Sequence, residues 1–361
     1  MKGYFSAVVL ILLFGWFPSL ASGAYLEDGS GGDHHRQSSP TRPYLGHPDE
    51  PLHPFQPPFR KPFPCCPEAT FAQRMDSLSV GWPWVHKQMI LYPLLGRDIP
   101  SPHFCSLNDA MAKGWLWIEE TGDASSLWGC NRSGEYMFLM VGQIVAGGWQ
   151  NRSLSSDVIL GPWMERIRLP VFCVEKGRWD GRHTSFVASP GSSPSSLRKR
   201  LAGNATQTEI WDEVDRVARH ANSRNHTQDL SQTLMTSPYL SEVNEYIETF
   251  RNKVLPGHCV GMMVFCGDRF VGVDLFATNR LFKDMRDDLV GGYAWEMLGQ
   301  RPSWWKKPGR IQAQQILRRI RESRVSGTST TGEGTGLLLR GDKIQGSGII
   351  FQDGLIHLHV W

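Results

Sequence analysis

One short stretch of the sequence combines residue types that could do acid–base chemistry on a bound ligand. Residues 171–174 form an apolar run typical of a buried strand, and Glu175, Arg178 and Trp179 follow it closely. Because side chains alternate along a strand, Glu175 shares a face with Cys173, and partial burial would raise its carboxyl pKa towards a value that suits a general acid or base. The Arg178 guanidinium could hold a phosphate or carboxylate through two hydrogen bonds, and Trp179 could stack on a ring.

The same residues also fit a structural strand end without any catalytic role. Glu175 would then pair with Lys176 or Arg178, and Trp179 would close the edge of the core. A pocket leaves Glu175 and Arg178 facing a concavity, whereas a structural strand end pairs them on a convex edge or sequesters them. Cys173 fits a buried, unreactive thiol better than a nucleophile, because a nucleophile needs a nearby base.

A second polar cluster, residues 142–153, follows another apolar run. Two adjacent glycines and Trp149 precede the side-chain donors here, and glycines let the backbone approach a ligand closely. A tight turn with polar side chains would explain the same pattern. We expect both polar clusters to line one pocket for a small anionic, sugar-like or nucleotide-like ligand. Its predicted ligand-binding residues are Gln143, Asn151, Arg152, Arg178 and Trp179, with Glu175 as acid or base in a hydrolytic step.

Two further polar features lie in strand-like runs near the C-terminus. Asp274 interrupts the run 271–276, and a carboxylate there is costly unless it is paired or catalytic, so Asp274 is a second candidate catalytic residue. His357 and His359 share one strand face. Two histidines alone are an incomplete metal site, and an exposed sheet face fits them better. The sequence therefore predicts no metal ligands and indicates no particular cofactor.

The elements that must position these residues suggest an α+β fold. The chain runs from strands through helices, a hairpin and a helix to closing strands, which predicts a single domain with a mixed or mainly antiparallel sheet and packed helices. Helical patterns cover residues 106–112, 208–224, 240–254, 279–298 and 309–322. Strand patterns cover 89–96, one long buried run at 136–148, two strands within 157–179, a hairpin at 260–276 that turns at Gly267-Asp268, and two or three closing strands that turn at Asp353-Gly354. Residues 180–207 and about 325–336 have the composition of loops.

The N-terminus indicates export. Residues 1–23 have the pattern of a secretory signal peptide, and the Pro-, Gly- and His-rich segment 24–75 is typical of a disordered linker before a domain at 76–361. We therefore expect a secreted or periplasmic protein, without stable membrane insertion because no second apolar run approaches 18 residues. The formal net charge of +3 and the 20% of charged residues give no sign of nucleic-acid binding. The seven cysteines are an odd number, so at least one has no partner within the chain.

Several blocks of the sequence resemble, in the same order, a family called the ARG and rhodanese-phosphatase-superfamily-associated protein domain. The specific blocks are GQIVAGGWQNR (142–152) and CVEKGRW (173–179), and the resemblance covers about 85–361. It implies an α+β domain, an enzyme or binder linked to ADP-ribose or nucleotides, and it marks Gln143, Asn151, Arg152, Glu175, Gly177, Arg178, Trp179 and Asp274. Members often carry Glu and Lys where this chain has Gln143 and Trp149, which weakens an acid–base role for residues 142–153. The sequence leaves open whether the protein is an enzyme or a non-catalytic exported binding or interaction module.

Overall fold

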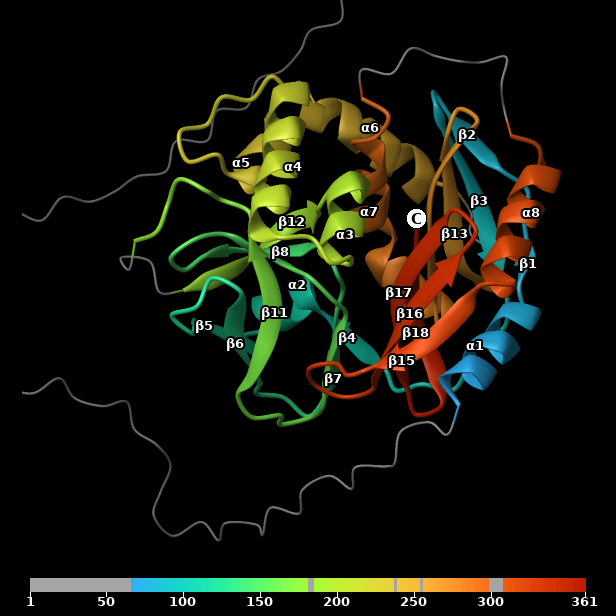
Figure 1. The fold of residues 1–361 in the computed structure, drawn as a ribbon, viewed down its shortest axis with the longest axis horizontal. Helices are drawn as coiled ribbons and strands as arrows, with labels where there is room; N and C mark the ends of the chain where they lie inside the picture. The colour runs from blue at the N-terminus through green and yellow to red at the C-terminus, as the bar shows by residue number, and fades with distance from the viewer. Residues whose placement is uncertain (1–65, 181–184, 237–238, 254–255, 299–307) are drawn as a thin grey trace, which may run out of the picture. The chain divides into compact units, whose positions relative to one another are not determined.

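The computed structural model describes residues 66–180, 185–236, 239–253, 256–298 and 308–361, which all belong to one compact unit, residues 60–361. Helices and mainly antiparallel sheets give it the predicted α+β fold (Figure 1). The predicted signal peptide, 1–23, and residues 24–65 of the predicted linker lie outside the described residues. No helix in the described part of the chain is long and apolar enough to cross a membrane.

The largest sheet contains both the predicted hairpin and the closing strands. Its order is β1 (Ser79–Val80), β3 (Met89–Leu95), β13 (Cys259–Cys266), β14 (Arg269–Phe276), β18 (Gly354–Val360), β17 (Ile344–Phe351), β16 (Thr335–Gly341) and β15 (Arg324–Thr328), and β2 (Trp84–His86) also pairs with β3. The pairings are antiparallel. Because β14 and β18 are neighbours, Asp274 lies directly opposite His359, and Phe276 opposite His357.

Two smaller sheets carry the polar clusters at 142–153 and 173–179. One has the order β12 (Phe186–Ser192), β8 (Gln143–Gly147), β9 (Arg152–Leu154), β11 (Ile167–Cys173), β6 (Ser126–Asn131) and β5 (Leu116–Glu120). The other has the order β10 (Val158–Leu160), β7 (Tyr136–Leu139) and β4 (Phe104–Ser106), and the β4–β7 pairing is parallel. The pairing of β9 with β11 brings the two clusters together, because Cys173 lies opposite Arg152.

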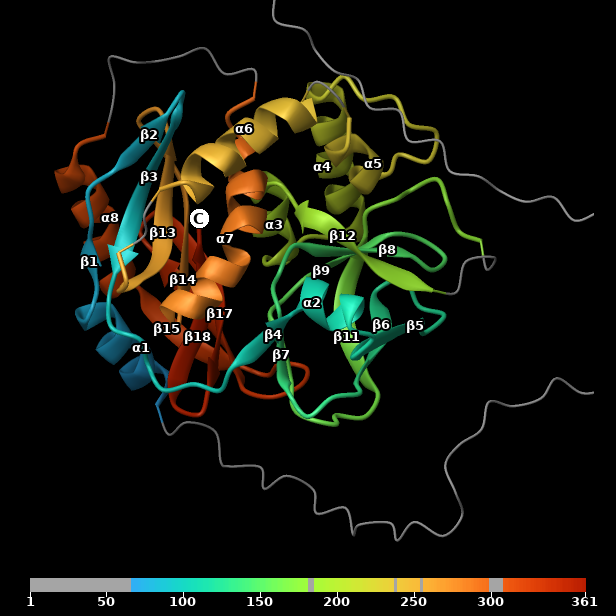
Figure 2. The ribbon, with the colours of Figure 1, turned by 180° about the vertical axis from the view of Figure 1, so that it is seen from behind.

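Helices cover both faces of the largest sheet. α1 (Pro67–Asp76) and α8 (Arg310–Arg321) pack on one face through an apolar core that includes Met75 and Leu317. α6 (Tyr239–Arg251) and α7 (Asn279–Ala294) contribute to the core on the other face. Figure 2 shows α7 between the largest sheet and the six-stranded sheet, and it contacts both β13 and β12.

The remaining helices pack around the six-stranded sheet. They are α2 (Leu107–Ala112), α3 (Ser195–Leu201), α4 (Gln207–His220) and α5 (Leu230–Leu234). α4 starts at a capping box in which Thr206 and Glu209 bond each other's backbone N–H, and Ile210, Val214 and Val217 form its buried stripe.

Four segments differ from the sequence predictions. One is the predicted loop at about 325–336, which contains β15 and the start of β16. The apolar run 136–148 is two strands, β7 and β8, because the chain turns at Gly142, whose φ is +88°. The predicted loop 180–207 contains β12 and α3. Several serines in these elements are buried, although a serine-rich composition is typical of an exposed loop. Helix α1 lies within the segment 24–75 that the sequence marks as linker, and Phe71 and Met75 anchor it to the core.

The cysteines that the structure describes are unpaired. Cys105, Cys173 and Cys259 are buried, whereas Cys66, Cys130 and Cys266 are more exposed. Cys65 lies outside the described residues.

Candidate functional site

Glu175 is held by two neighbours that occupy both of its carboxylate oxygens. Its Oε1 accepts a hydrogen bond from Arg178 Nε at 2.9 Å, and its Oε2 accepts from Arg178 Nη2 at 2.7 Å. Oε2 also accepts from the backbone N of Asn151 at 3.1 Å, and the residue is only 3% exposed. Glu175 therefore lies in a bidentate, sequestered ion pair, as in the structural interpretation of the strand end.

Arg178 uses its remaining donors to fix the turn between β8 and β9. Nη1 donates to the carbonyl oxygen of Gly148 at 2.6 Å, and Nη2 also lies 3.2 Å from the Gly147 carbonyl oxygen and from Asn151 Oδ1. Glu175 outweighs the effect of burial and raises the pKa of Arg178 above its ordinary value. The pair thus clamps this turn to the end of β11.

Asn151 extends the clamp to a segment that the sequence did not point to. Its Oδ1 accepts from the backbone N of Gly147 at 2.8 Å, and its Nδ2 donates to Asp229 Oδ1 at 2.9 Å. Asp229 also caps α5 by accepting from the backbone N of Ser231, and burial raises its pKa. The sequence around Asp229 is that of an ordinary helix cap, so it did not indicate that the Asp229 side chain would also contact Asn151.

Arg152 differs from Arg178 because part of its guanidinium lacks acceptors. The side chain is fully buried at 0% exposure, and Nη1 donates to the carbonyl oxygen of Gln150 at 2.7 Å. Nε and Nη2 make no hydrogen bond with any residue that the structure describes. These two donors form one edge of the guanidinium, the edge that binds carboxylates and phosphates through two parallel hydrogen bonds.

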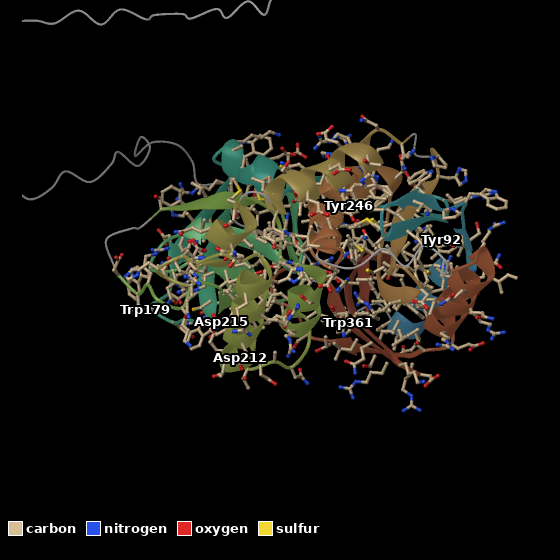
Figure 3. All side chains as sticks on the ribbon, turned by 90° about the horizontal axis from the view of Figure 1, so that it is seen from above. Tyr92, Trp179, Asp212, Asp215, Tyr246 and Trp361 are labelled. Carbon is tan, nitrogen blue, oxygen red and sulfur yellow. The ribbon has the colours of Figure 1, made fainter. Side chains whose placement is uncertain are left out.

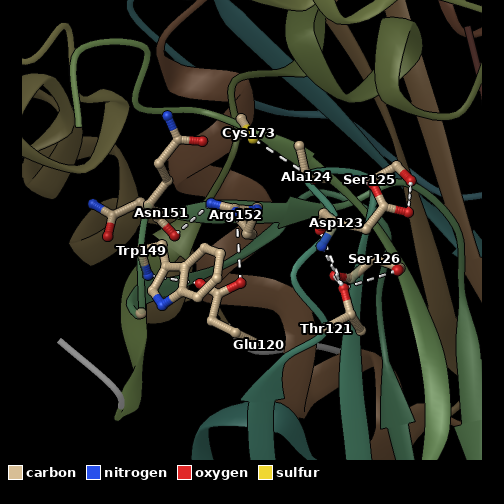
Figure 4. A network of polar contacts seen from close by, with 12 residues as sticks. Glu120, Thr121, Asp123, Ala124, Ser125, Ser126, Trp149, Asn151, Arg152 and Cys173 are labelled. Carbon is tan, nitrogen blue, oxygen red and sulfur yellow. Dashed lines mark hydrogen bonds and ion pairs between the residues drawn. The ribbon is translucent and has the colours of Figure 1, made fainter. Parts of the chain in front are cut away.

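Glu120, at the end of β5, lies beside this edge without filling it. Its Oε2 is 3.7 Å from Arg152 Nη2, which is a charge contact but too long for a hydrogen bond (Figure 4). Its Oε1 accepts from the backbone N of Trp149 at 2.6 Å, and Oε2 has no hydrogen-bond partner in the described structure. Glu120 was missed from the sequence, because nothing in the run WLWIEE distinguishes it from its neighbour Glu119.

The Trp179 indole lies over the Arg152 guanidinium. The Trp179 ring lies 5.5 Å from Arg152 Cζ and packs edge to face against Trp149, with ring centroids 5.2 Å apart. Trp179 is 50% exposed and lies at the periphery of the molecule (Figure 3). Gly148, with φ +52°, makes room for this arrangement, since a Cβ there would collide with the Phe186 ring and with Glu120 Oε1.

The two other predicted members of this region have local structural roles. Gln143 is buried, and its Oε1 accepts from the backbone N of Met140, which closes the turn between β7 and β8. Cys173 is also buried, its Sγ contacts the carbonyl oxygen of Ala124, and burial raises the pKa of its thiol. That environment suits the predicted unreactive thiol.

Asp274 belongs to a different and fully buried network. Arg198 donates to its two oxygens at 2.7 and 3.2 Å, and Tyr293 donates to Oδ2 at 2.6 Å. Burial opposes ionisation of Asp274, but Arg198 and the histidines outweigh it and hold the carboxyl pKa well below its usual range. Asp274 is thus paired, and it ties β14 to α3 and α7.

His357 and His359 belong to this network, so the predicted exposed sheet face was wrong. Both are 0% exposed, and the His357 ring packs against the rings of Phe138 and Phe276. His357 bonds Asp157 at 2.7 Å and Asp274 at 3.1 Å; burial opposes its protonation, but the two carboxylates raise its pKa to about 9. His359 lies 3.2 Å from Asp274 Oδ1, and burial lowers its pKa. Within the described ranges, no group of three or more His, Cys, Asp or Glu residues is arranged to hold a metal ion.

Comparison with known protein families identifies the family to which this domain belongs. The sequence profile of the ARG and Rhodanese-Phosphatase-superfamily-associated Protein domain matches residues 77–361, which include every residue of both polar networks. No curated protein and no solved structure matches the chain.

Proposed function

The chain belongs to the ARG and Rhodanese-Phosphatase-superfamily-associated Protein domain family, and we propose that it is a non-catalytic ligand-binding module. The binding site is formed by Arg152, Trp149 and Trp179. The ligand is a small molecule that combines a flat ring or sugar with an anionic group. The ring stacks on the exposed indole, and the anionic group reaches the guanidinium below it.

The observation that carries this proposal is the buried guanidinium edge of Arg152. A buried donor without an acceptor costs about 1–3 kcal/mol, and more when the group is charged. Two such donors on one edge are therefore unusual unless something supplies acceptors for them. A ligand oxyanion supplies two, and the half-exposed Trp179 offers it a surface to stack on.

Hydrolysis by Glu175 has less support. A general base needs a carboxylate oxygen that can reach a substrate proton, and both Glu175 oxygens are already bonded to Arg178 or Asn151. Asp274 is likewise bonded and fully buried. In the proposed function, the Glu175–Arg178 pair is the support that holds the turn carrying Trp149.

We further propose that the module is exported. The apolar segment within residues 1–23 and the small residues after it support cleavage of a signal peptide. The Pro-rich composition of the segment before α1 supports its role as a spacer for the domain. Mass spectrometry of the protein secreted by its native host tests this directly, since an intact Met1 end on exported protein would contradict cleavage.

Thermal-shift measurements on the full chain test ligand binding. The ligands are ADP-ribose, AMP, glucose 6-phosphate and glucuronate, and a ligand at 100 times its Kd stabilises the protein by about 2.7 kcal/mol. We expect at least one to raise Tm, and the rise to disappear in Trp179→Ala.

Trp163→Ala is the matched control for that variant. Trp163 is also a largely exposed indole, at 67%, but the indole over the Arg152 guanidinium is that of Trp179. A Tm rise that survives Trp179→Ala, or that Trp163→Ala abolishes equally, would contradict the proposed site. An assay for hydrolysis products of the bound ligand separates the two functions, because a binding module leaves its ligand intact.

A further inference from the structure

We propose that Glu120 is a built-in placeholder for a phosphate or carboxylate group, which displaces it from the Nε–Nη2 edge of Arg152. This inference rests on the proposed function, and it names the group that the site recognises and the residue that restrains binding. Glu120 contributes the opposite charge that a buried guanidinium needs, but it does not make the hydrogen bonds that the guanidinium can form.

The geometry of the two side chains supports a displaceable partner. Glu120 is held through Oε1 by the Trp149 backbone N at 2.6 Å, which keeps Oε2 at 3.7 Å from Arg152 Nη2. Oε2 and the two guanidinium donors all lack hydrogen-bond partners among the described residues. By contrast, Glu175 accepts two hydrogen bonds from Arg178, as expected for a permanent ion pair.

The surroundings favour an oxyanion over other occupants of this edge. The edge offers two parallel N–H donors and a full positive charge, which match the spacing of two oxygens on a carboxylate or phosphate. The indole of Trp179 lies over the guanidinium, so water is excluded and the charge interaction is stronger than at an open surface. A neutral ligand would leave Glu120 in place and the donors unpaired.

The test uses calorimetric titration of the full chain with inorganic phosphate and, separately, with acetate. These probes lack a ring, so they report on the guanidinium edge alone. Glu120→Gln keeps an acceptor for the Trp149 backbone N and removes the competing charge. We expect it to tighten binding of at least one probe by about tenfold or more, because repulsion between the carboxylate and the incoming anion is gone. Tighter phosphate binding than acetate binding assigns a phosphate ligand, and the reverse assigns a carboxylate ligand.

Two further variants control the result. Glu119→Gln removes the same charge from the neighbouring position of β5, where Glu119 pairs with the exposed Arg166 on the other face, and should leave affinity unchanged. Arg152→Lys in the Glu120→Gln background keeps the positive charge but loses the paired donors, and should abolish the gain. An unchanged or weaker affinity in Glu120→Gln, an equal gain in Glu119→Gln, or a gain that survives Arg152→Lys would overturn the inference.

If Glu120→Gln does not fold, Glu120→Asp carries the test, because the shorter side chain draws the carboxylate back from the Arg152 edge. Phosphate or acetate should then bind more tightly than to the wild type, and an unchanged affinity would overturn the inference. The outcome is separable from that of the proposed function. Tight anion binding by Glu120→Gln without any response to ring-bearing ligands would contradict stacking on the Trp179 indole but would support the oxyanion site.

Discussion

Asp274→Asn should strongly destabilise the protein, and the reason can be worked out from the charges around it. The buried network holds two cations, Arg198 and protonated His357, and two anions, Asp274 and Asp157, so it is neutral as a whole. Asparagine has almost the same shape but no charge. The substitution leaves one uncompensated positive charge at a site where Arg198 and His357 are essentially unexposed.

Breaking a buried ion pair by removing one partner typically costs about 3–5 kcal/mol. We expect a loss in this range in the free energy of unfolding of the full chain, measured by urea denaturation with far-UV circular dichroism. Such a loss is a large part of the 5–15 kcal/mol that is typical of folded proteins.

Tyr293→Phe provides the comparison for Asp274→Asn. It removes only one hydrogen bond to the same carboxylate, at 2.6 Å, and should cost about 1.5–3 kcal/mol. A second variant, Arg198→Met with Asp274→Asn, removes both charges of the pair and should recover part of the loss. A cost below about 1 kcal/mol for Asp274→Asn alone would refute the reasoning, because it would mean that the network does not depend on its charge balance.

Three further predictions concern the other polar groups. Arg178→Ala should lower the free energy of unfolding by about 2–4 kcal/mol in urea denaturation, since it leaves the buried Glu175 carboxylate without its cation, whereas a neutral effect would show that the clamp is dispensable. The folded-state pKa of His357, about 9, lies above its unfolded value of about 6.5, so its contribution is fully present below about pH 6.5 and is lost as pH rises through 9. Tm should therefore fall over that window, and His357→Gln should flatten the fall; an equally steep fall in the variant would contradict the assignment. Gly148→Ala should destabilise by about 1–3 kcal/mol in the same denaturation assay, because its φ is +52° and the new Cβ collides with Phe186, and a fully stable variant would show that the turn can relax.

The elements that could be predicted from the sequence are those with local signals. The hairpin of β13 and β14 carries a two-residue turn between two apolar strands, and α4 carries a stripe of apolar residues at helical spacing. The division of 136–148 into β7 and β8 could not be seen, because nearly every residue on both sides of the turn is apolar and buried. Arg198 was missed for the opposite reason, since the run SLRKR looks like a solvated charge cluster.

The contacts of the candidate site show the same limit. The sequence predicted that Asn151 and Glu175 lie together, because each follows an apolar run, and the two residues are hydrogen-bonded although β9 lies between β8 and β11 in the sheet. Glu120 and Asp229 come from β5 and from the start of α5, and only the sheet order and the packing of α5 bring them to the site. The surroundings of His357 likewise include residues far along the chain, namely Phe138 and Asp157. Contacts between residues that are far apart in the sequence cannot be predicted from the local spacing of residue types.

The arginines of the candidate site and of the buried network differ in how many of their N–H donors have a hydrogen-bond acceptor. Arg178 and Arg198 each meet a carboxylate through two hydrogen bonds, with Glu175 and Asp274 as partners. Arg152 is just as deeply buried as Arg198, yet its carboxylate neighbour stops at 3.7 Å and is bonded instead to a backbone N–H. A purely structural role would favour closing that gap, because a direct hydrogen bond to a charged group is worth about 1.5–3 kcal/mol. The arginine with unfilled donors also lies under the half-exposed indole of Trp179, where an incoming ligand could reach it once that ring moves. The unfilled donors of Arg152 and the aromatic ring above it therefore favour Arg152 as the ligand-binding residue. Glu175 and Asp274 are fully paired, which favours a structural role for both.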